Sequence, residues 1–525
     1  MRLPYLNIQI PKQTYAINVF RGLNQNIIAT ADGEWSDMRN ISDRYYPIIA
    51  SRPSRGATEQ TFEAPKGILY KNGLFHIDGT KAYYKGAEKF SVTDTDKHIV
   101  GMGAYACVFP DGVIYNTFKD TVEQMAASYT QSSAITFEPL SKKSVFTKIT
   151  ATGIGNTFSK NDNVTISGCT NESYNATKII TDAGTDYIVV TGALDEAFTQ
   201  SSGLKFERKV PELDYVVEKD NRIFGCSSKN HEVYCCKLGD PKNWYNYESG
   251  ADNAWAATVG SDGEFTACAK YSNSVLFFKE NAVHILRGDK PSNFSMTEKE
   301  LPGVRKGCDK SVVNINDTLY YVGRNGVYSY DGAIPQKISN NITEEISDAV
   351  ACKYDSKLYI SCKLGTVQGL LVYDPRTNIW DIEDDTVFKF AAFTDGTMHY
   401  VGADNTLSEI YGSKDEKIDW YLESQDMIEN SLDQKYISLI KLNLWLAVGT
   451  ELYAYIKYDD EPQWQRKGYI RSTVNKTYTL PIKPRRCSKY RIKLQGSGQF
   501  KLLGMSRNVE QGSEINGSLQ YQYHR

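Results

Sequence analysis

The sequence predicts an all-β protein whose centre is a β-propeller of about seven blades. A hairpin phrase recurs along the chain with a period of about 40 to 45 residues, which is typical of propeller blades. A second hairpin follows most copies, so one unit contains four short predicted strands. Aromatic residues make up 12% of the 525 residues, with 36 tyrosines. Such side chains favour strands because they fit a pleated, half-buried surface.

The recurring phrase is a strand, a turn of Asn, Asp or Ser with a small or polar partner, and an aliphatic–aromatic strand. Asn-Gly and Asp-Gly favour tight hairpin turns because these residues tolerate positive φ. The predicted units begin near residues 66, 99, 214, 265, 311, 349 and 388. The count falls to six blades if the second unit loses its outer hairpin to an insertion. The copies are YKNGLFHID (70–78), FPDGVIYNT (109–117), EKDNRIFGC (218–226), YSNSVLFFK (271–279), INDTLYYVG (315–323), YDSKLYISC (354–362) and FTDGTMHYV (393–401).

A second phrase occurs twice, as LGDPKNW (Leu238–Trp244) and LVYDPRTNIW (Leu371–Trp380). Proline has a fixed φ that suits the second position of a turn, and a polar residue then completes the turn. The phrase therefore predicts the connection between the third and fourth strands of a blade. We expect its tryptophan to begin the outermost strand and to cover the edge of a neighbouring blade.

The chain divides into four predicted regions. Residues 1–120 form an N-terminal arm and the first blades, and residues 212–412 form the remaining blades. Residues 121–211 (Thr121–Pro211) interrupt the period and predict an inserted small antiparallel β module, since a loop tip tolerates insertion. Residues 413–525 predict a C-terminal β-sandwich over Lys417–Val509, because longer alternating strands such as IKLNLWLA replace the blade phrase. The last sixteen residues are polar and are expected to be loosely held.

Bulk properties exclude several classes of protein. The formal net charge of −3 does not suggest a polycationic nucleic-acid binder. The N-terminus shows no signal-peptide pattern, and no segment has the roughly 18 consecutive apolar residues of a membrane helix. Ten cysteines are scattered through predicted strands, which suggests free thiols and synthesis in a reducing cytoplasm. We expect no membrane insertion.

The best metal candidate is Cys235–Cys236 with His231, and it is weak. Adjacent strand residues point to opposite faces, and no C-x₂₋₄-C spacing occurs among the ten cysteines. A glycosidase would need two carboxylates that converge on the propeller axis, but the acidic run DIEDD is ordinarily a solvated turn between blades. No nucleophile elbow or phosphate-binding loop is present. We therefore expect no enzyme, no metal site and no cofactor. The carboxylates considered are Glu344, Glu345, Asp381, Glu383, Asp384 and Asp385.

One local basic segment, KPRRCSKYR, is the only candidate contact site for DNA or for an acidic partner. Basic side chains next to an aromatic ring could meet phosphates. The ordinary interpretation is a strand whose outward positions happen to be basic. The basic cluster comprises Lys483, Arg485, Arg486, Lys489 and Arg491.

Several stretches resemble a family of tailed-phage virion proteins, the packaged-DNA stabilisation or tail nozzle (tail tubular) proteins. The resemblance begins with FRGLNQNIIATADGEWSDMRNISDRYYPIIASRPSRG (20–56) and covers most of the chain except the insert. It continues through NRIFGCSS, VYCCKLGDPKNW, SVLFFKENAVHILRGD, NGVYSYDGAIPQKIS, DQKYISLIKLNLWL and PIKPRRCSKYRIKLQGSG. None of these motifs is catalytic.

The resemblance implies a structural component of a phage tail, made in the bacterial host cytoplasm. It implies a homohexameric ring below the portal and adaptor that extends the channel for packaged double-stranded DNA. Such a ring would retain the DNA until ejection. The alternative is a receptor- or glycan-binding propeller at the tail tip, which would expose aromatic residues for sugar stacking.

Overall fold

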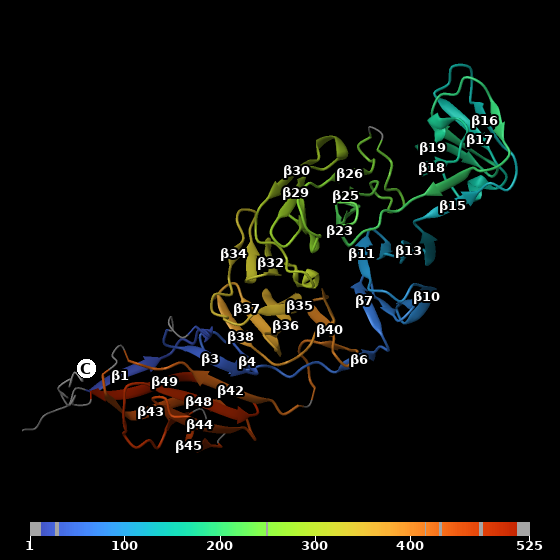
Figure 1. Ribbon diagram of the computed structural model, residues 1–525. Coiled ribbons are helices and arrows are strands. Elements are labelled where there is room, and N and C mark those ends of the chain that lie inside the picture. Colours follow the sequence, from blue (N-terminus) through green and yellow to red (C-terminus); the bar gives the residue numbers. More distant parts are fainter. Residues whose placement is uncertain are drawn as a thin grey trace, which may run out of the picture.

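The computed structural model describes residues 12–26, 31–247, 250–414, 416–429, 433–471 and 476–511. Regular structure in these ranges is β-strand, apart from short 3₁₀ turns. Three β bodies lie in a row, with the insert at one end, the propeller in the middle and the sandwich at the other end (Figure 1). The predicted all-β class is confirmed. The 3₁₀ turns are η1 (Ile154–Asn156), η2 (Glu172–Tyr174), η3 (Pro291–Asn293) and η4 (Asp309–Ser311).

Seven four-stranded antiparallel sheets form the blades of the propeller (Figure 1). All seven predicted units are present, so the alternative of six blades is excluded. Blades 1 to 3 are β7 (Pro65–Tyr70), β8 (Leu74–Asp78), β9 (Lys81–Tyr84) and β10 (Ala87–Ser91); β11 (His98–Met102), β12 (Tyr105–Phe109), β13 (Val113–Asn116) and β14 (Thr121–Gln124); and β23 (Tyr215–Lys219), β24 (Arg222–Ser227), β25 (Glu232–Cys235) and β26 (Trp255–Thr258). Blades 4 to 6 are β27 (Ala267–Tyr271), β28 (Ser274–Phe278), β29 (Val283–Arg287) and β30 (Ser295–Lys299); β31 (Val313–Ile315), β32 (Thr318–Gly323), β33 (Gly326–Tyr330) and β34 (Gln336–Lys337); and β35 (Ile346–Tyr354), β36 (Lys357–Leu364), β37 (Val367–Asp374) and β38 (Ile379–Ile382).

Blade 7 closes the ring with a strand from the other end of the propeller segment. Its strands are β39 (Phe390–Thr394), β40 (Thr397–Val401), β41 (Thr406–Glu409) and, outermost, β6 (Thr58–Thr61). The first strands of neighbouring blades adjoin from β39 through β7, β11 and β23 to β27, and from β31 through β35 back to β39. Closure by β6 pairs segments about 350 residues apart in the chain, which no local sequence pattern indicated.

The predicted hairpin turns adopt the backbone conformation that their residues favour. Asp220 and Asn221 have φ of 52° and 58°, and Asp355 and Ser356 have φ of 49° and 59°. Two successive residues in the left-handed region are what a two-residue hairpin of matching twist requires. Six of the phrases join the first and second strands of a blade. The phrase at 109–117 instead joins the second and third strands of blade 2.

The insert lies between blades 2 and 3, and two details differ from the prediction. Blade 2 keeps all four strands, because residues 121–124 form its outermost strand β14 and do not belong to the insert. The module itself runs from β15 to β22, whose ends pair with each other through Ala127 and Arg208. It forms one eight-stranded sheet. Its strands are β15 (Ala127–Thr130), β16 (Ile135–Pro139), β17 (Phe146–Thr150), β18 (Asn163–Ser167), β19 (Thr177–Gly184), β20 (Tyr187–Thr191), β21 (Phe198–Gln200) and β22 (Lys205–Arg208).

The C-terminal sandwich is confirmed, but it also incorporates the N-terminal arm. One sheet has seven strands and the other has six, and each contains strands from both ends of the chain. The N-terminal arm therefore belongs to the sandwich, which the predicted boundary at residue 413 did not include. Residues 512–525, most of the predicted loose tail, lie outside the described residues. The seven-stranded sheet contains β1 (Lys12–Ile17), β4 (Ile41–Ser42), β5 (Ile49–Ser51), β43 (Lys435–Leu446), β46 (Lys476–Thr479), β47 (Arg486–Cys487) and β49 (Phe500–Gln511). The six-stranded sheet contains β2 (Gly22–Leu23), β3 (Glu34–Arg39), β42 (Asp419–Ser424), β44 (Glu451–Tyr458), β45 (Gln465–Ile470) and β48 (Tyr490–Ser497).

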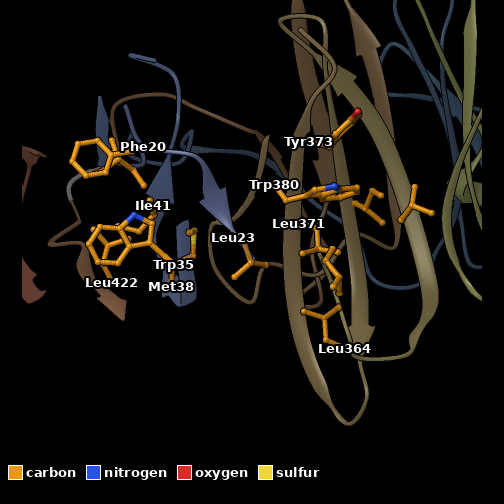
Figure 2. Close-up of a cluster of buried hydrophobic side chains, with 14 of the residues drawn as sticks. Phe20, Leu23, Trp35, Met38, Ile41, Leu364, Leu371, Tyr373, Trp380 and Leu422 are labelled. Carbon is orange, nitrogen blue, oxygen red and sulfur yellow. The ribbon is translucent and has the colours of Figure 1, made fainter. Parts of the chain in front are cut away.

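One hydrophobic core continues from the sandwich into blades 4 to 6. Figure 2 shows Leu23 of β2 between the sandwich group around Trp35 and the blade 6 group around Trp380. The strands approach closely here: a Cβ on Gly22 would lie 2.4 Å from the Trp380 carbonyl oxygen, and Gly22 has a φ of 71°. Only glycine fits both conditions. The sandwich is thus packed directly onto the propeller.

Both copies of the Asp-Pro phrase lie between the third and fourth strands of a blade, as predicted. Trp380 begins the outer strand region of blade 6 and donates from Nε1 to the Ile338 carbonyl oxygen of blade 5 at 3.0 Å. Trp244 lies in the connection before β26 and packs edge-on against Phe109 of blade 2. Each tryptophan covers the preceding blade, but only Trp380 lies on the outermost strand.

Candidate functional site

The basic cluster lies on the sandwich, around β47 and the start of β48, but most of its charges are already paired. Arg485 contacts Glu461 at 2.5 Å, and Arg491 contacts Glu423 at 2.8 Å. Lys489 lies between Asp426 and Asp460, at 3.1 and 2.8 Å. Arg486 also has a partner, and Lys483 is exposed. A DNA phosphate would have to displace a carboxylate at three of the five positions. The cluster is therefore not a free basic surface.

The acidic run at 381–385 is not a solvated turn, and the expectation for it was wrong. Asp381 and Glu383 are 1% and 0% exposed, and Asp384 is 8% exposed. Arg55, on the linker from the sandwich to the propeller, reaches Glu383 and Asp384 at 2.8 Å each. A buried charge needs such a partner. The run is thus part of the junction between the two bodies.

Arg52 extends this junction. It bonds Asp384 at 3.2 Å and Glu416, on the chain returning to the sandwich, at 2.8 Å. Burial raises the pKa of Glu383, whereas Arg55 lowers it. Burial also acts to raise the pKa of Asp384, but Arg55 and Arg52 bring it below its usual range. Because burial and the arginine charges shift these pKa values in opposite directions, each buried carboxylate needs a guanidinium partner to offset the cost of burying its charge. The network clamps both chain crossings between propeller and sandwich.

A second buried group lies beside it. Lys357 of β36 bonds Asp43, and it lies 3.3 Å from Asp374 of the Asp-Pro phrase. The backbone N–H of Asp43 donates to Asp381 at 2.8 Å. Burial raises the pKa of Asp381, and the charge of Asp43 raises it further. Every carboxylate here contacts a structural partner, so the network does not present the pair of open carboxylates that a glycosidase requires.

The propeller axis holds a small pocket of about 280 Å³. The first strands of blades 1, 2, 3, 6 and 7 line it. Lys310 lies over the Phe390 ring at 4.3 Å, and Lys97, which is fully buried, pairs with Asp111 at 2.5 Å. Burial lowers the pKa of His98. This volume is slightly below the roughly 300–1,000 Å³ of ordinary ligand pockets, and it is far too small for a double helix, whose major groove alone is about 12 Å wide.

Cys235 and Cys236 do not form a joint site. Cys235 packs in the core between blades 3 and 4, and Cys236 packs in the core between blades 2 and 3. They therefore face opposite sides of the sheet, as adjacent strand residues do. His231 is an exposed turn residue with a φ of 52°. Burial raises the pKa of Cys235 to about 12 and that of Cys236 well above its usual value. The free, buried cysteines are structural.

Sequence reasoning did not find the outer face of the six-stranded sheet. Tyr453 and Tyr469 lie 5.0 Å apart between ring centroids, and Tyr469 is 51% exposed. The Trp464 ring is approached by three cations within about 6 Å, from Lys457, Arg491 and Lys493. A pocket of about 380 Å³ adjoins Tyr421 and Tyr453. The alternating pattern of the predicted sandwich strands indicated an outward face, but it did not indicate which side chains of β42, β44 and β45 lie next to one another there.

The chain resembles solved structures only weakly. No family model and no curated protein matches the chain. Among solved structures, BamB from Moraxella catarrhalis has 9% identity and a TM-score of 0.34, covering 69% of this chain and 98% of its own. The computationally designed protein Ika8 has 10% identity and a TM-score of 0.32, covering 68% and 99%. The endosialidase of phage phi92 has 11% identity and a TM-score of 0.24, covering 77% and 70%. Likeness at this level carries no argument about function, and the fold assignment rests on the strand pairing itself.

Proposed function

We propose that the protein is a non-enzymatic structural component of a phage tail, assembled as a homohexameric ring below the portal and adaptor. The observation that carries the proposal is the junction between sandwich and propeller. A continuous core and a buried ionic network hold the two bodies in one orientation. The sequence resemblance to tail nozzle proteins supports the same role. A rigid multi-body subunit is suited to carrying load within a ring.

The axial pocket limits how such a ring would conduct DNA. Double-stranded DNA cannot pass through the centre of one propeller, because the pocket there is only about 280 Å³. The channel of the proposed ring would therefore lie between subunits. A net charge of −3 and paired basic side chains suit a channel through which DNA slides, since unpaired cations would retain DNA by counterion release.

The test is electron microscopy of the purified full chain mixed with portal and adaptor from the same phage. We expect an added six-fold layer below the adaptor. A variant that carries Arg55→Ala should add the layer less completely. The Arg39→Ala variant, which changes an exposed ion pair, should add the layer as completely as the unaltered chain does. Absence of the layer for the unaltered chain would contradict the proposal.

A glycan-binding role is the second candidate, and one observation favours it. Tyr453, Tyr469 and Trp464 form an aromatic surface on the sandwich, and exposed rings can stack on sugars. A glycan array with the unaltered chain and a Tyr453→Ala/Tyr469→Ala variant tests it. Specific binding that the variant loses would favour this role over the ring.

A further inference from the structure

Three metal-binding side chains converge where the propeller closes. Glu59 lies on β6, His399 on β40 and Glu409 on β41. One ligand atom from each lies within 4.8 Å of the others, and His399 Nδ1 is 2.9 Å from a Glu59 carboxylate oxygen. No local sequence pattern indicates this group, because Glu59 and His399 are 340 residues apart.

The backbone places these groups together by two devices. His399 and Glu409 are directly opposite each other on β40 and β41, and such pairs have Cβ atoms about 4.5–5.5 Å apart. Glu59 is the extra residue in an irregular register between β6 and β41, since Gln60 pairs with Leu407 and Thr58 with Ser408. A bulge of this kind redirects a side chain.

Among the residues that the structure describes, the two carboxylates have no permanent positive partner. In the described part of the chain, neither Glu59 nor Glu409 has a lysine or arginine within ion-pair distance, and Glu59 pairs only with His399. Tyr70 of blade 1 packs on the His399 ring, with centroids 4.9 Å apart. Two anions therefore face one partly enclosed spot that a cation would neutralise.

We propose that Glu59, His399 and Glu409 bind a divalent transition-metal ion that fastens the closing strand β6 to blade 7. One imidazole and two carboxylates suit Zn²⁺ or a similar ion, and three protein ligands leave a position for water. Bonds of about 2.0–2.2 Å need small movements of the flexible glutamates. Glu59 is 36% exposed and His399 is 12% exposed, so the ion has a path from solvent.

The ion would act as a mechanical fastener. β6 is the outermost strand of blade 7 and leads directly from the linker that carries Arg52 and Arg55. If the junction opened, force on the sandwich would reach blade 7 through β6 and through β41, the two strands that continue into the chain crossings. An ion that bridges β6, β40 and β41 joins both ends of the propeller segment at that point.

The test uses the full chain, stripped of metal with EDTA, and titrated with Zn²⁺ by calorimetry. Co²⁺ provides a visible absorption spectrum as a second readout. We expect one saturable ion per chain and slower amide exchange in β6 when Zn²⁺ is bound. Glu409→Gln keeps the shape and removes one charge, so it should fold, weaken Zn²⁺ binding at least about 10- to 100-fold and abolish the β6 protection. His399→Ala should do the same.

Two matched controls change the same residue types elsewhere. His231→Ala alters an exposed turn histidine, and Glu63→Gln alters an exposed glutamate close to β6. Both should bind Zn²⁺ as the unaltered chain does. The proposal is overturned if Zn²⁺ does not saturate a site, if Glu409→Gln binds it equally well, or if binding leaves β6 exchange unchanged.

Discussion

Replacing Arg55 with alanine should weaken the junction between the sandwich and the propeller. The guanidinium is 5% exposed and Glu383 is 1% exposed, so solvent screens this ion pair little. Removing one partner of a buried pair costs about 3–5 kcal/mol, because the other charge is left uncompensated. Arg52 still contacts Asp384 at 3.2 Å, so we expect a loss of about 3 kcal/mol, at the lower end of that range.

The free energy of unfolding that Arg55→Ala removes should depend on pH in a defined direction. Burial already raises the pKa of Glu383, and Arg55 opposes that rise. Without Arg55 the folded pKa rises further. A carboxyl group whose folded pKa exceeds its unfolded value contributes stability that is present below the unfolded pKa and is lost as the pH rises through the folded pKa. The penalty of Arg55→Ala should therefore be largest in alkaline solution and should shrink as the pH falls toward about 4.5, the ordinary glutamate value.

The assay is urea unfolding followed by tryptophan fluorescence at several pH values, with limited proteolysis at the linker. Arg39→Ala is the control, because the Arg39–Asp385 pair is 46% and 63% exposed and such pairs contribute at most about 1 kcal/mol. A loss below 1 kcal/mol for Arg55→Ala, or a penalty that grows as the pH falls, would refute the reasoning.

Four further outcomes are expected. Trp380→Ala should cost about 3–5 kcal/mol in urea unfolding, because a fully buried indole is removed; a loss no larger than that of an exposed residue would contradict this. Asn243→Ala should speed hydrogen exchange in β18 of the insert, because the side chain of Asn243, in the Asp-Pro phrase of blade 3, accepts a hydrogen bond from the Asn163 backbone N–H at 2.8 Å. Unchanged exchange would count against this contact between the insert and the propeller. Arg485→Gln with Lys489→Gln should leave the salt dependence of DNA binding unaltered, since both cations are paired; a slope change of about one per residue would show phosphate contacts. Burial raises the pKa of Cys235 to about 12, so this thiol should resist DTNB in the folded protein, and rapid labelling mapped to it would disprove the burial.

The sequence alone determined the parts of this protein that depend on short-range geometry. The seven units, the hairpin turns at residues such as Asp220–Asn221, and the alternating strands of the sandwich were all predicted correctly. Each is set by φ preferences and side-chain period over about ten residues. The opposite orientation of Cys235 and Cys236 followed from the same strand period.

Only the tertiary structure decided the contacts between distant segments. Strand β6 closes blade 7, the N-terminal arm joins both sandwich sheets, and Arg55 meets Glu383 across 328 positions of sequence. A charged run such as 381–385 has the same composition whether it is solvated or buried. Its environment depends on which distant segment of the chain covers it, and the local sequence pattern does not specify that segment. The physical reason is that turns and strands form from neighbouring residues, whereas burial and charge pairing are properties of the assembled fold.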